Sequence, residues 1–180
     1  MVGRANQVVS DLHAVLYVHD GKVFWYHASF PDFIFTQARS KFSMPISASG
    51  ASSQTVDMSC DPAFHHALLT HSCFRIMKSG LCFNICSLPS SFLLDSEVPN
   101  LKVEDKICHS LRYACLYWAE HMVEATPSEH EALQGHVKEF LDTHVLFWIE
   151  AMNLLQVSSQ CAHMLLKVHD CILKVRELYI

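Results

Sequence analysis

The sequence predicts a mainly α-helical protein with one short β-hairpin near its N-terminus. The dipeptide Asp20-Gly21 lies between two runs rich in β-branched and aromatic residues, at 12–18 and 22–26, which is typical of a hairpin. From residue 61 onward, apolar residues recur at three- and four-residue intervals, as they do in amphipathic helices. A chain of 180 residues can hold one domain, or a small domain beside a larger helical one.

The first part of the chain, residues 1–42, reads as a helix, the hairpin and a second helix, an order that matches the C-terminal part of a winged-helix domain. We expect the second helix over residues 30–39, with Pro31 in the first turn, where backbone amides lack helical partners. Ser29 is the predicted N-cap, and Asp32 is expected to reach back to it in a capping box. The side chains of this helix that are predicted to be buried are Phe30, Phe33 and Ile34.

Two segments lack helical periodicity. Small polar residues dominate positions 43–53, so residues 43–56 are predicted to form a flexible linker. Residues 87–101 contain two prolines and four serines and are expected to run over the surface. Apart from this second segment, residues 57–180 are predicted to form a helical domain.

Four helices are expected in the helical domain, packed as a bundle or a short solenoid. They are predicted at residues 61–80, 103–125, 129–155 and 159–178, with a break in the third near Thr143. Asp61 and Pro62 would start the first, and Ser128 with Glu131 would form a capping box for the third. The expected buried stripes are Phe64, Leu68, Cys73 or Phe74 and Met77 in the first helix, Ile107, Leu111, Ala114 or Cys115, Trp118 and Met122 in the second, and Cys161, Leu165, Val168, Ile172, Val175 and Leu178 in the fourth.

The composition indicates a soluble, cytoplasmic protein with apolar surface that packs against a neighbour. Hydrophobic residues make up 51% of the chain and charged residues 17%, yet no run approaches the roughly 20 apolar residues of a membrane span. The N-terminus lacks the apolar region of a signal peptide, and the eight cysteines show no disulfide-framework spacing. With a net charge of −5 and scattered basic residues, nucleic-acid binding is not expected.

No motif predicts catalysis. The chain has neither a Gly-x-Ser-x-Gly elbow nor a phosphate-binding loop, so by itself it is expected to bind no nucleotide and to be no enzyme. Among the cysteines, only the spacing of Cys82 and Cys86 fits a zinc-ligand pair. The nearest histidines that could accompany this pair are more distant in the sequence: His65, His66 and His71. We interpret these two cysteines as part of a short apolar turn, predict no metal site, and keep a Cys/His metalloprotein as the weakest alternative.

His27 is the one candidate site residue. It lies where the predicted hairpin passes into the predicted helix, a position from which a side chain can be held out of the core and directed at a ligand. A hydrogen-bonded structural imidazole is an equally reasonable interpretation at such a corner. The residue type and its position leave both readings open.

Several motifs together resemble a known family. They are His27-x-Ser29-Phe30-x-Asp32-Phe33, Asn84-Ile85-Cys86, Leu111-Arg112-Tyr113-Ala114-Cys115-x-x-Trp118 and Phe147-Trp148-Ile149-Glu150-Ala151-Met152. This series, within residues 10–157, resembles the region that follows the nucleotide-binding core in fungal NACHT-type (STAND or NLR-like) NTPases. Those proteins are relatives of vegetative-incompatibility proteins, and many carry terminal WD repeats.

The resemblance implies a role as a regulatory arm. In such switches the winged-helix unit folds back over the nucleotide pocket, and a histidine at its strand-to-helix corner contacts the β-phosphate of ADP; His27 looks like that residue. ADP or ATP would then belong to the parent family, with the nucleotide-binding core of the same or a related protein as the partner. The chain would be a non-catalytic fragment in which the helical part transmits the rotation. The alternative is a free-standing helical adaptor that binds proteins through apolar helical surface.

Overall fold

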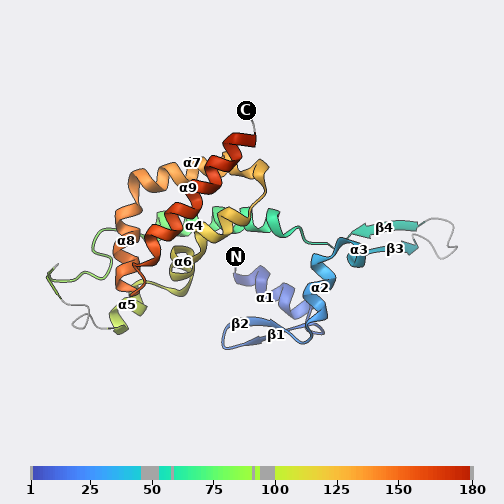
Figure 1. Ribbon diagram of the computed structural model, residues 1–180. Helices are drawn as coiled ribbons and strands as arrows, with labels where there is room; N and C mark the ends of the chain where they lie inside the picture. The colour runs from blue at the N-terminus through green and yellow to red at the C-terminus, as the bar shows by residue number, and fades with distance from the viewer. Residues whose placement is uncertain (1, 46–52, 58, 91, 94–99, 179–180) are drawn as a thin grey trace. The chain divides into compact units, whose positions relative to one another are not determined.

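The computed structural model describes residues 2–45, 53–57, 59–90, 92–93 and 100–178. It is mainly helical, with β-hairpins in its N-terminal third, which confirms the predicted fold class (Figure 1). The chain divides into two compact units, Met1–Asp61 and Pro62–Ile180. We call them the hairpin unit and the helical unit and describe each by itself. The assignment of the first part to a winged-helix domain stays a prediction.

The hairpin unit contains three helices and two antiparallel hairpins in its described residues. The elements are α1 Val2–Asp11, β1 Leu16–His19, β2 Lys22–Trp25, α2 Ser29–Phe35, α3 Gln37–Ser40, β3 Lys41–Pro45 and β4 Ser53–Asp57. In the first hairpin, His19 pairs with Lys22, so Asp20 and Gly21 form a two-residue turn. Both have positive φ, 49° and 70°, as the tight turns of such hairpins require. The predicted hairpin is therefore confirmed in position.

The predicted helix over residues 30–39 is instead two short helices. Thr36 is extended, with φ −109° and ψ 101°, and separates α2 from α3. The backbone amide of Cys60 donates to the carbonyl of Ile34 at 2.7 Å, which occupies the acceptor that a continuing helix would have used. Phe30, Phe33 and Ile34 are half-buried, and α2 contains no fully buried residue.

The predicted capping box of α2 is absent. Ala28 is the N-cap and no side-chain capping hydrogen bond is formed there. The hydroxyl of Ser29 contacts the ring of His27, and the carboxylate of Asp32 lies 4.0 Å from the guanidinium of Arg39. Each predicted capping side chain thus has a different partner.

Strands occupy part of the predicted linker. Lys41 pairs with Asp57, and the pairing continues to Pro45 opposite Ser53; residues 46–52 lie outside the described part of the chain. The prediction of a flexible linker over 43–56 is therefore wrong for the paired residues. Small polar residues suggested a loop, but the backbone amides and carbonyls of this segment find partners across the hairpin. The division after Asp61 falls shortly beyond the predicted domain start at residue 57.

The helical unit is built around α6. Its helices are α4 Pro62–Gly80, α5 Asn100–Lys106, α6 His109–Glu124, α7 Pro127–Thr143, α8 Val145–Leu154 and α9 Gln160–Leu178. Helix α6 packs against α4, α8 and α9, and α7 packs against α4, α8 and α9 (Figure 1). No helix in the described part of the chain is long and apolar enough to cross a membrane.

The core of the helical unit confirms the stripe predicted for the second helix. All of its members are buried: Ile107, Leu111, Ala114, Cys115, Trp118 and Met122. The predicted helix over 103–125 is, however, interrupted between α5 and α6. The break predicted near Thr143 is confirmed, because α7 ends at that residue and α8 begins at Val145. In the last helix, Cys161 and Val168 are buried as expected and Leu165 and Ile172 are half-buried; the side chains predicted to be buried at positions 175 and 178 lie outside the described part.

Two local predictions in the helical unit are wrong. In the stripe predicted for the first helix, Phe64 and Leu68 are each 47% exposed, whereas its other members Cys73, Phe74 and Met77 are buried as expected. The first half of α4 is apolar on more than one side, so its spacing does not define which face is buried. At α7 the N-cap is Thr126 without a side-chain capping bond, and the Ser128 hydroxyl donates to Thr126 Oγ1 instead of forming the capping box.

Candidate functional site

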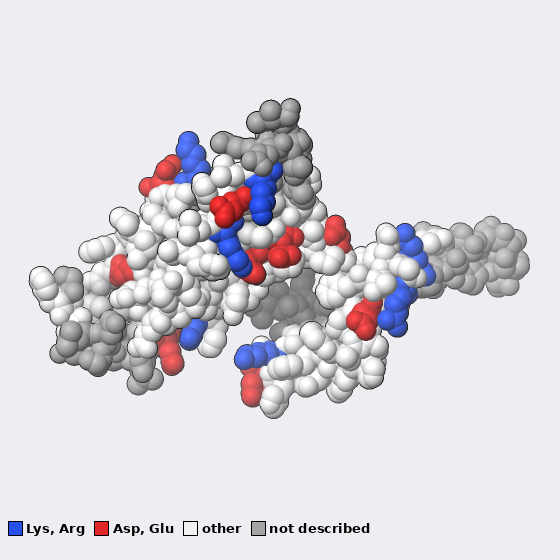
Figure 2. Space-filling view, viewed as in Figure 1, with Lys and Arg blue, Asp and Glu red and all other residues white. Residues whose placement is uncertain are grey.

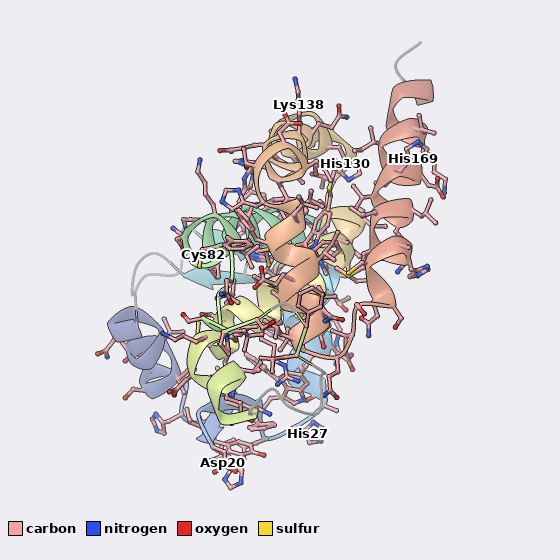
Figure 3. The ribbon with its side chains drawn as sticks, turned by 90° about the vertical axis from the view of Figure 1, so that its left-hand side faces the viewer. Asp20, His27, Cys82, His130, Lys138 and His169 are labelled. Carbon is pink, nitrogen blue, oxygen red and sulfur yellow. The ribbon has the colours of Figure 1, made fainter. Side chains whose placement is uncertain are left out.

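His27 lies at the predicted corner between β2 and α2. The backbone amide of Tyr26 donates to Val15, which closes the base of the hairpin, and the amide of Phe30 donates to the carbonyl of His27, which starts the turn of α2. The side chain of His27 is exposed and lies near the hairpin that carries Asp20 (Figure 3). The structure thus confirms the position of this residue, while its role remains a prediction.

The two ring nitrogens of His27 have different surroundings. The backbone N–H of Ser29 donates to Nδ1 at 3.1 Å, and the Ser29 hydroxyl lies 2.7 Å from the same atom. An amide can only donate, so Nδ1 is the acceptor and a neutral ring carries its proton on Nε2. Within the described residues Nε2 has no hydrogen-bond partner. The structural and the ligand-facing interpretations are therefore compatible, because Nδ1 holds the ring and Nε2–H is free to donate.

A cavity of about 750 Å³ opens beside His27 within the hairpin unit. Its lining is mostly apolar and includes Phe30, Phe33 and Ile34. Arg39 and Cys60 also line it, and sequence reasoning did not select either as a site residue. Nothing in the sequence pattern brings Cys60 to this place; the backbone bond from its amide to Ile34 does so. The cavity therefore combines apolar walls with two nitrogen donors, the His27 imidazole and the Arg39 guanidinium.

The other motifs of the series meet in the helical unit. The carboxylate of Glu150 accepts the backbone N–H groups of Asn84 and Ile85 at 3.1 and 3.2 Å. The indole N–H of Trp148 donates to the carbonyl of Cys115 at 3.0 Å. These motifs, separated by up to 66 residues, are thus joined by hydrogen bonds. Their arrangement stabilises the fold and presents no reactive group.

A histidine pair joins α4 to α6. The Nδ1 atoms of His66 and His121 lie 3.0 Å apart, and the hydroxyl of Tyr113 lies 2.6 Å from Nε2 of His121. Burial, and then the neighbouring His66, lower the pKa of His121. Both ring nitrogens of His121 therefore have partners, and its charged form is disfavoured.

The cysteines do not provide a nucleophile at the core. Burial raises the pKa of Cys73 to about 11 and that of Cys115 to about 12, so both thiols stay protonated at neutral pH. Cys86 is buried, as predicted, but Cys82 is exposed. Among the residues that the structure describes, no three His, Cys, Asp or Glu side chains are grouped so that they could hold a metal ion.

On the face shown in Figure 2, Lys and Arg alternate with Asp and Glu, and neither kind gathers into a large patch. Two ion pairs on the helical unit have similar geometry: Lys78 with Glu139 at 2.5 Å, and Lys167 with Glu120 at 2.6 Å.

Comparison with known proteins gives one distant relationship. No protein-family model matches the sequence, and no solved structure matches it. The chain is 26% identical over 161 residues to the vegetative incompatibility protein HET-E-1 of Podospora anserina, an alignment that covers 84% of this chain and 11% of that relative. Neither unit alone is long enough to account for 84% of the chain, so the similarity runs through both. The chain is therefore distantly linked to NACHT-type incompatibility proteins.

Proposed function

We propose that the chain is the non-catalytic regulatory and helical arm of a NACHT-type signalling NTPase. In this role it couples nucleotide state to conformational change in an immune or incompatibility-like switch in the cytoplasm. The observation that carries the proposal is the similarity to HET-E-1 through both units. The chain spans 11% of the length of that relative. The activity of a whole protein of this kind is therefore also part of the proposal.

In this proposal His27 contacts the β-phosphate of ADP held by a nucleotide-binding core. The available Nε2–H supports the role, because an N–H that donates to a diphosphate forms a charge-assisted hydrogen bond. Arg39 lines the same cavity and would supply a permanent positive charge. Both groups belong to the hairpin unit, which would therefore act as the latch, and the helical unit would transmit its movement.

Such a latch works as a population shift. The contact with ADP would favour the closed, inactive state and would weaken when ATP rearranges the domains, so the nucleotide binds the two states with different free energies. A ligand with equal affinity for both states would shift nothing. The quantity to measure is therefore the contribution of His27 to the difference in ADP-binding free energy between the two states.

The test is a chimera in which this chain replaces the matching segment of a complete NACHT-type relative. His27→Ala should raise signalling in the absence of a trigger and speed ADP release by about tenfold, the equivalent of one charge-assisted hydrogen bond. His19→Ala is the matched control, because His19 is exposed on the same hairpin and its ring lies 3.3 Å from the carboxylate of Asp20. An unchanged resting state and release rate in His27→Ala would contradict the latch.

The chain by itself should bind ADP and ATP negligibly in calorimetry. The phosphate-binding elements would come from the core, and His27 with Arg39 would supply only part of the site. Tight binding by the chain alone would contradict this division of roles.

A second candidate is a free-standing helical adaptor. It is favoured by large apolar side chains exposed on the helical unit, among them Phe83 at 80%, Leu146 at 74% and Leu166 at 61%. An adaptor would bind a separate full-length relative in trans. Sedimentation of the chain with a purified relative distinguishes the two, because only the adaptor forms a stable complex when not covalently joined.

A further inference from the structure

The helical unit contains a cavity between α4 and α7, with a volume of about 310 Å³. Its floor is formed by Phe74 and Phe140, which are 6% and 4% exposed and whose ring centroids lie 5.7 Å apart. The buried ring of Trp118 lies behind both, at 5.3 and 5.2 Å. Trp118 has no exposed surface and supports the two phenyl rings from beneath, so the exposed parts of Phe74 and Phe140 supply the apolar contact with a ligand.

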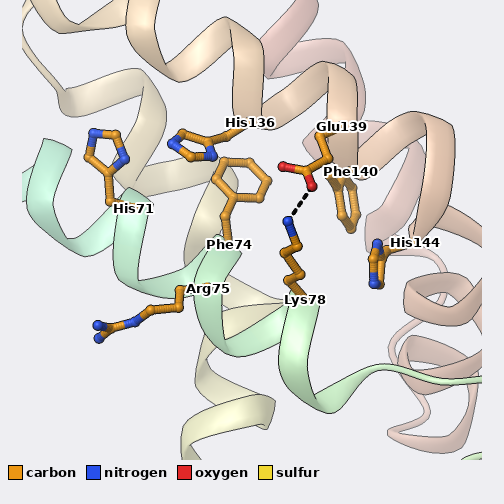
Figure 4. Close-up of a pocket in the computed structure, with 8 residues that line it drawn as sticks. All are labelled: His71, Phe74, Arg75, Lys78, His136, Glu139, Phe140 and His144. Carbon is orange, nitrogen blue, oxygen red and sulfur yellow. Dashed lines mark hydrogen bonds and ion pairs between the residues drawn. The ribbon is translucent and has the colours of Figure 1, made fainter.

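Imidazole rings form one side of this cavity. The ring of His136 stacks on Phe74 with an interplanar angle of 16°, and His71 meets His136 edge-on, with centroids 4.8 Å apart (Figure 4). His144 lines the opposite end. These rings place hydrogen-bonding nitrogens beside an apolar floor, a combination typical of small-molecule sites.

The rim of the cavity carries charge. Lys78 donates to Glu139 at 2.5 Å, which engages one of the three N–H donors of the ammonium group. This hydrogen bond, with smaller contributions from His136 and His144, holds the pKa of the Glu139 carboxyl below its usual value. Arg75 also lines the cavity, with its guanidinium directed away from the aromatic floor. Lys78 is therefore the permanent cation that is directed toward the cavity.

We propose that this cavity binds a small aromatic carboxylate. The ring would lie on Phe74 and Phe140, and the carboxylate would accept from Lys78 and from an imidazole of the wall. A monoanion fits better than a dianion, because Lys78 already shares its charge with Glu139. The site lies within the helical unit and is independent of the proposed nucleotide role of His27.

The first test is a fluorescence titration of the complete chain with β-naphthoate. Its neutral comparator is β-naphthylmethanol, which keeps the ring and lacks the charge. We expect saturable binding of the carboxylate, about tenfold tighter than that of the alcohol, and weaker binding at high salt. Equal affinity for the two probes, or no saturable binding of the carboxylate, would overturn the proposal.

Two variants separate a binding site from a structural ion pair. Lys78→Met keeps most of the apolar stem and should weaken β-naphthoate binding about tenfold, whereas Glu139→Gln removes a competing carboxylate and should strengthen it about threefold. If the ion pair had only a structural role, its loss would change the affinity for β-naphthoate in the same direction in both variants. Lys167→Met is the matched control, since Lys167 makes an equivalent pair with Glu120 outside the cavity, and it should leave affinity unchanged. Circular dichroism of each variant checks that the helical unit is intact, and affinity changes of the same sign in the first two variants would refute the assignment.

Discussion

The two units of this chain bury their side chains to very different degrees. In the helical unit a continuous core includes Trp118, Trp148 and Met152, all with no exposed surface. In the described part of the hairpin unit Ser40 alone is fully buried, while Trp25 and Tyr26 are 54% and 66% exposed. Apolar burial is the main favourable term in folding, so we expect the helical unit to be the more stable of the two. The candidate latch thus lies in the unit that we expect to be less stable, as is common for elements that move.

The largest effect is expected from a substitution that disrupts the core of the helical unit. Trp148→Ala should lower the free energy of unfolding by about 3–5 kcal/mol, because it creates a cavity among Trp118 and Phe140 and removes a buried hydrogen bond. Trp25→Ala, the same substitution on the exposed hairpin, should change it by less than about 0.5 kcal/mol. Urea unfolding followed by circular dichroism at helical wavelengths measures both. Similar losses in the two variants would show that the hairpin unit has a core of its own.

The next effect compares two tryptophans within that core. The indole N–H of Trp148 donates to Cys115, whereas that of Trp118 is buried without a partner in the described structure. Trp148→Phe removes the indole donor from the Cys115 carbonyl, which keeps its helical partner within α6, whereas Trp118→Phe removes a donor that was already unpaired. Trp148→Phe should therefore be the more destabilising by about 0.5–1.5 kcal/mol in urea unfolding. The reverse order would mean that the hydrogen bond to Cys115 contributes little.

These core positions also show what the sequence could predict. Long helices repeat their apolar spacing over several turns, so the stripe from Ile107 to Met122 and the break near Thr143 follow from pattern alone. The apolar face of α4 does not, because Phe64 and Leu68 fit the spacing as well as the residues that are actually buried. Tertiary packing chooses between such faces.

The hairpin unit was harder to predict for a different reason. Its local structure depends on hydrogen bonds that propensity rules do not contain. Ser29 is a favourable N-cap by residue type, but its amide and hydroxyl contact His27. The bond from Cys60 to Ile34 links residues far apart in the chain, ends α2 early and brings Cys60 to the cavity beside Arg39. The position of His27 was predictable from the corner, and the rest of its surroundings was not.

A pH-dependent effect is expected at His121 in the helical unit. The folded state lowers the pKa of His121, so the unfolded chain binds a proton that the folded chain resists. Stability should therefore be unaffected above the ordinary histidine pKa of about 6.5 and should fall as the pH drops below it, by at most about 1.4 kcal/mol per pH unit. His66, Tyr113 and Glu120 are the titratable neighbours of this group, and Glu120 opposes the shift.

The variant His121→Gln should flatten this pH dependence in urea unfolding between pH 5 and 8, the range in which an imidazole changes charge. His163→Gln, on the exposed face of α9, is the control and should keep the slope of the unmodified protein. An unchanged slope in His121→Gln would assign the acid sensitivity to other groups.

The smallest expected effects come from replacing glycine by alanine once in each unit. The two substitutions should change stability in opposite directions. An added Cβ would meet no atom within 4 Å at either Gly21 or Gly135, so neither site is limited by space. Gly21 has φ +70° in the hairpin turn, where an L-residue is strained, and Gly21→Ala should destabilise the hairpin unit by about 1 kcal/mol. Gly135 lies inside α7, where alanine is the better helix former, and Gly135→Ala should stabilise the helical unit by about 0.5–1 kcal/mol. Hydrogen exchange of the backbone amides in each unit resolves the two changes separately. If the units unfolded as one, each substitution would change the protection of amides in both units alike, and that result would contradict separate unfolding of the two units.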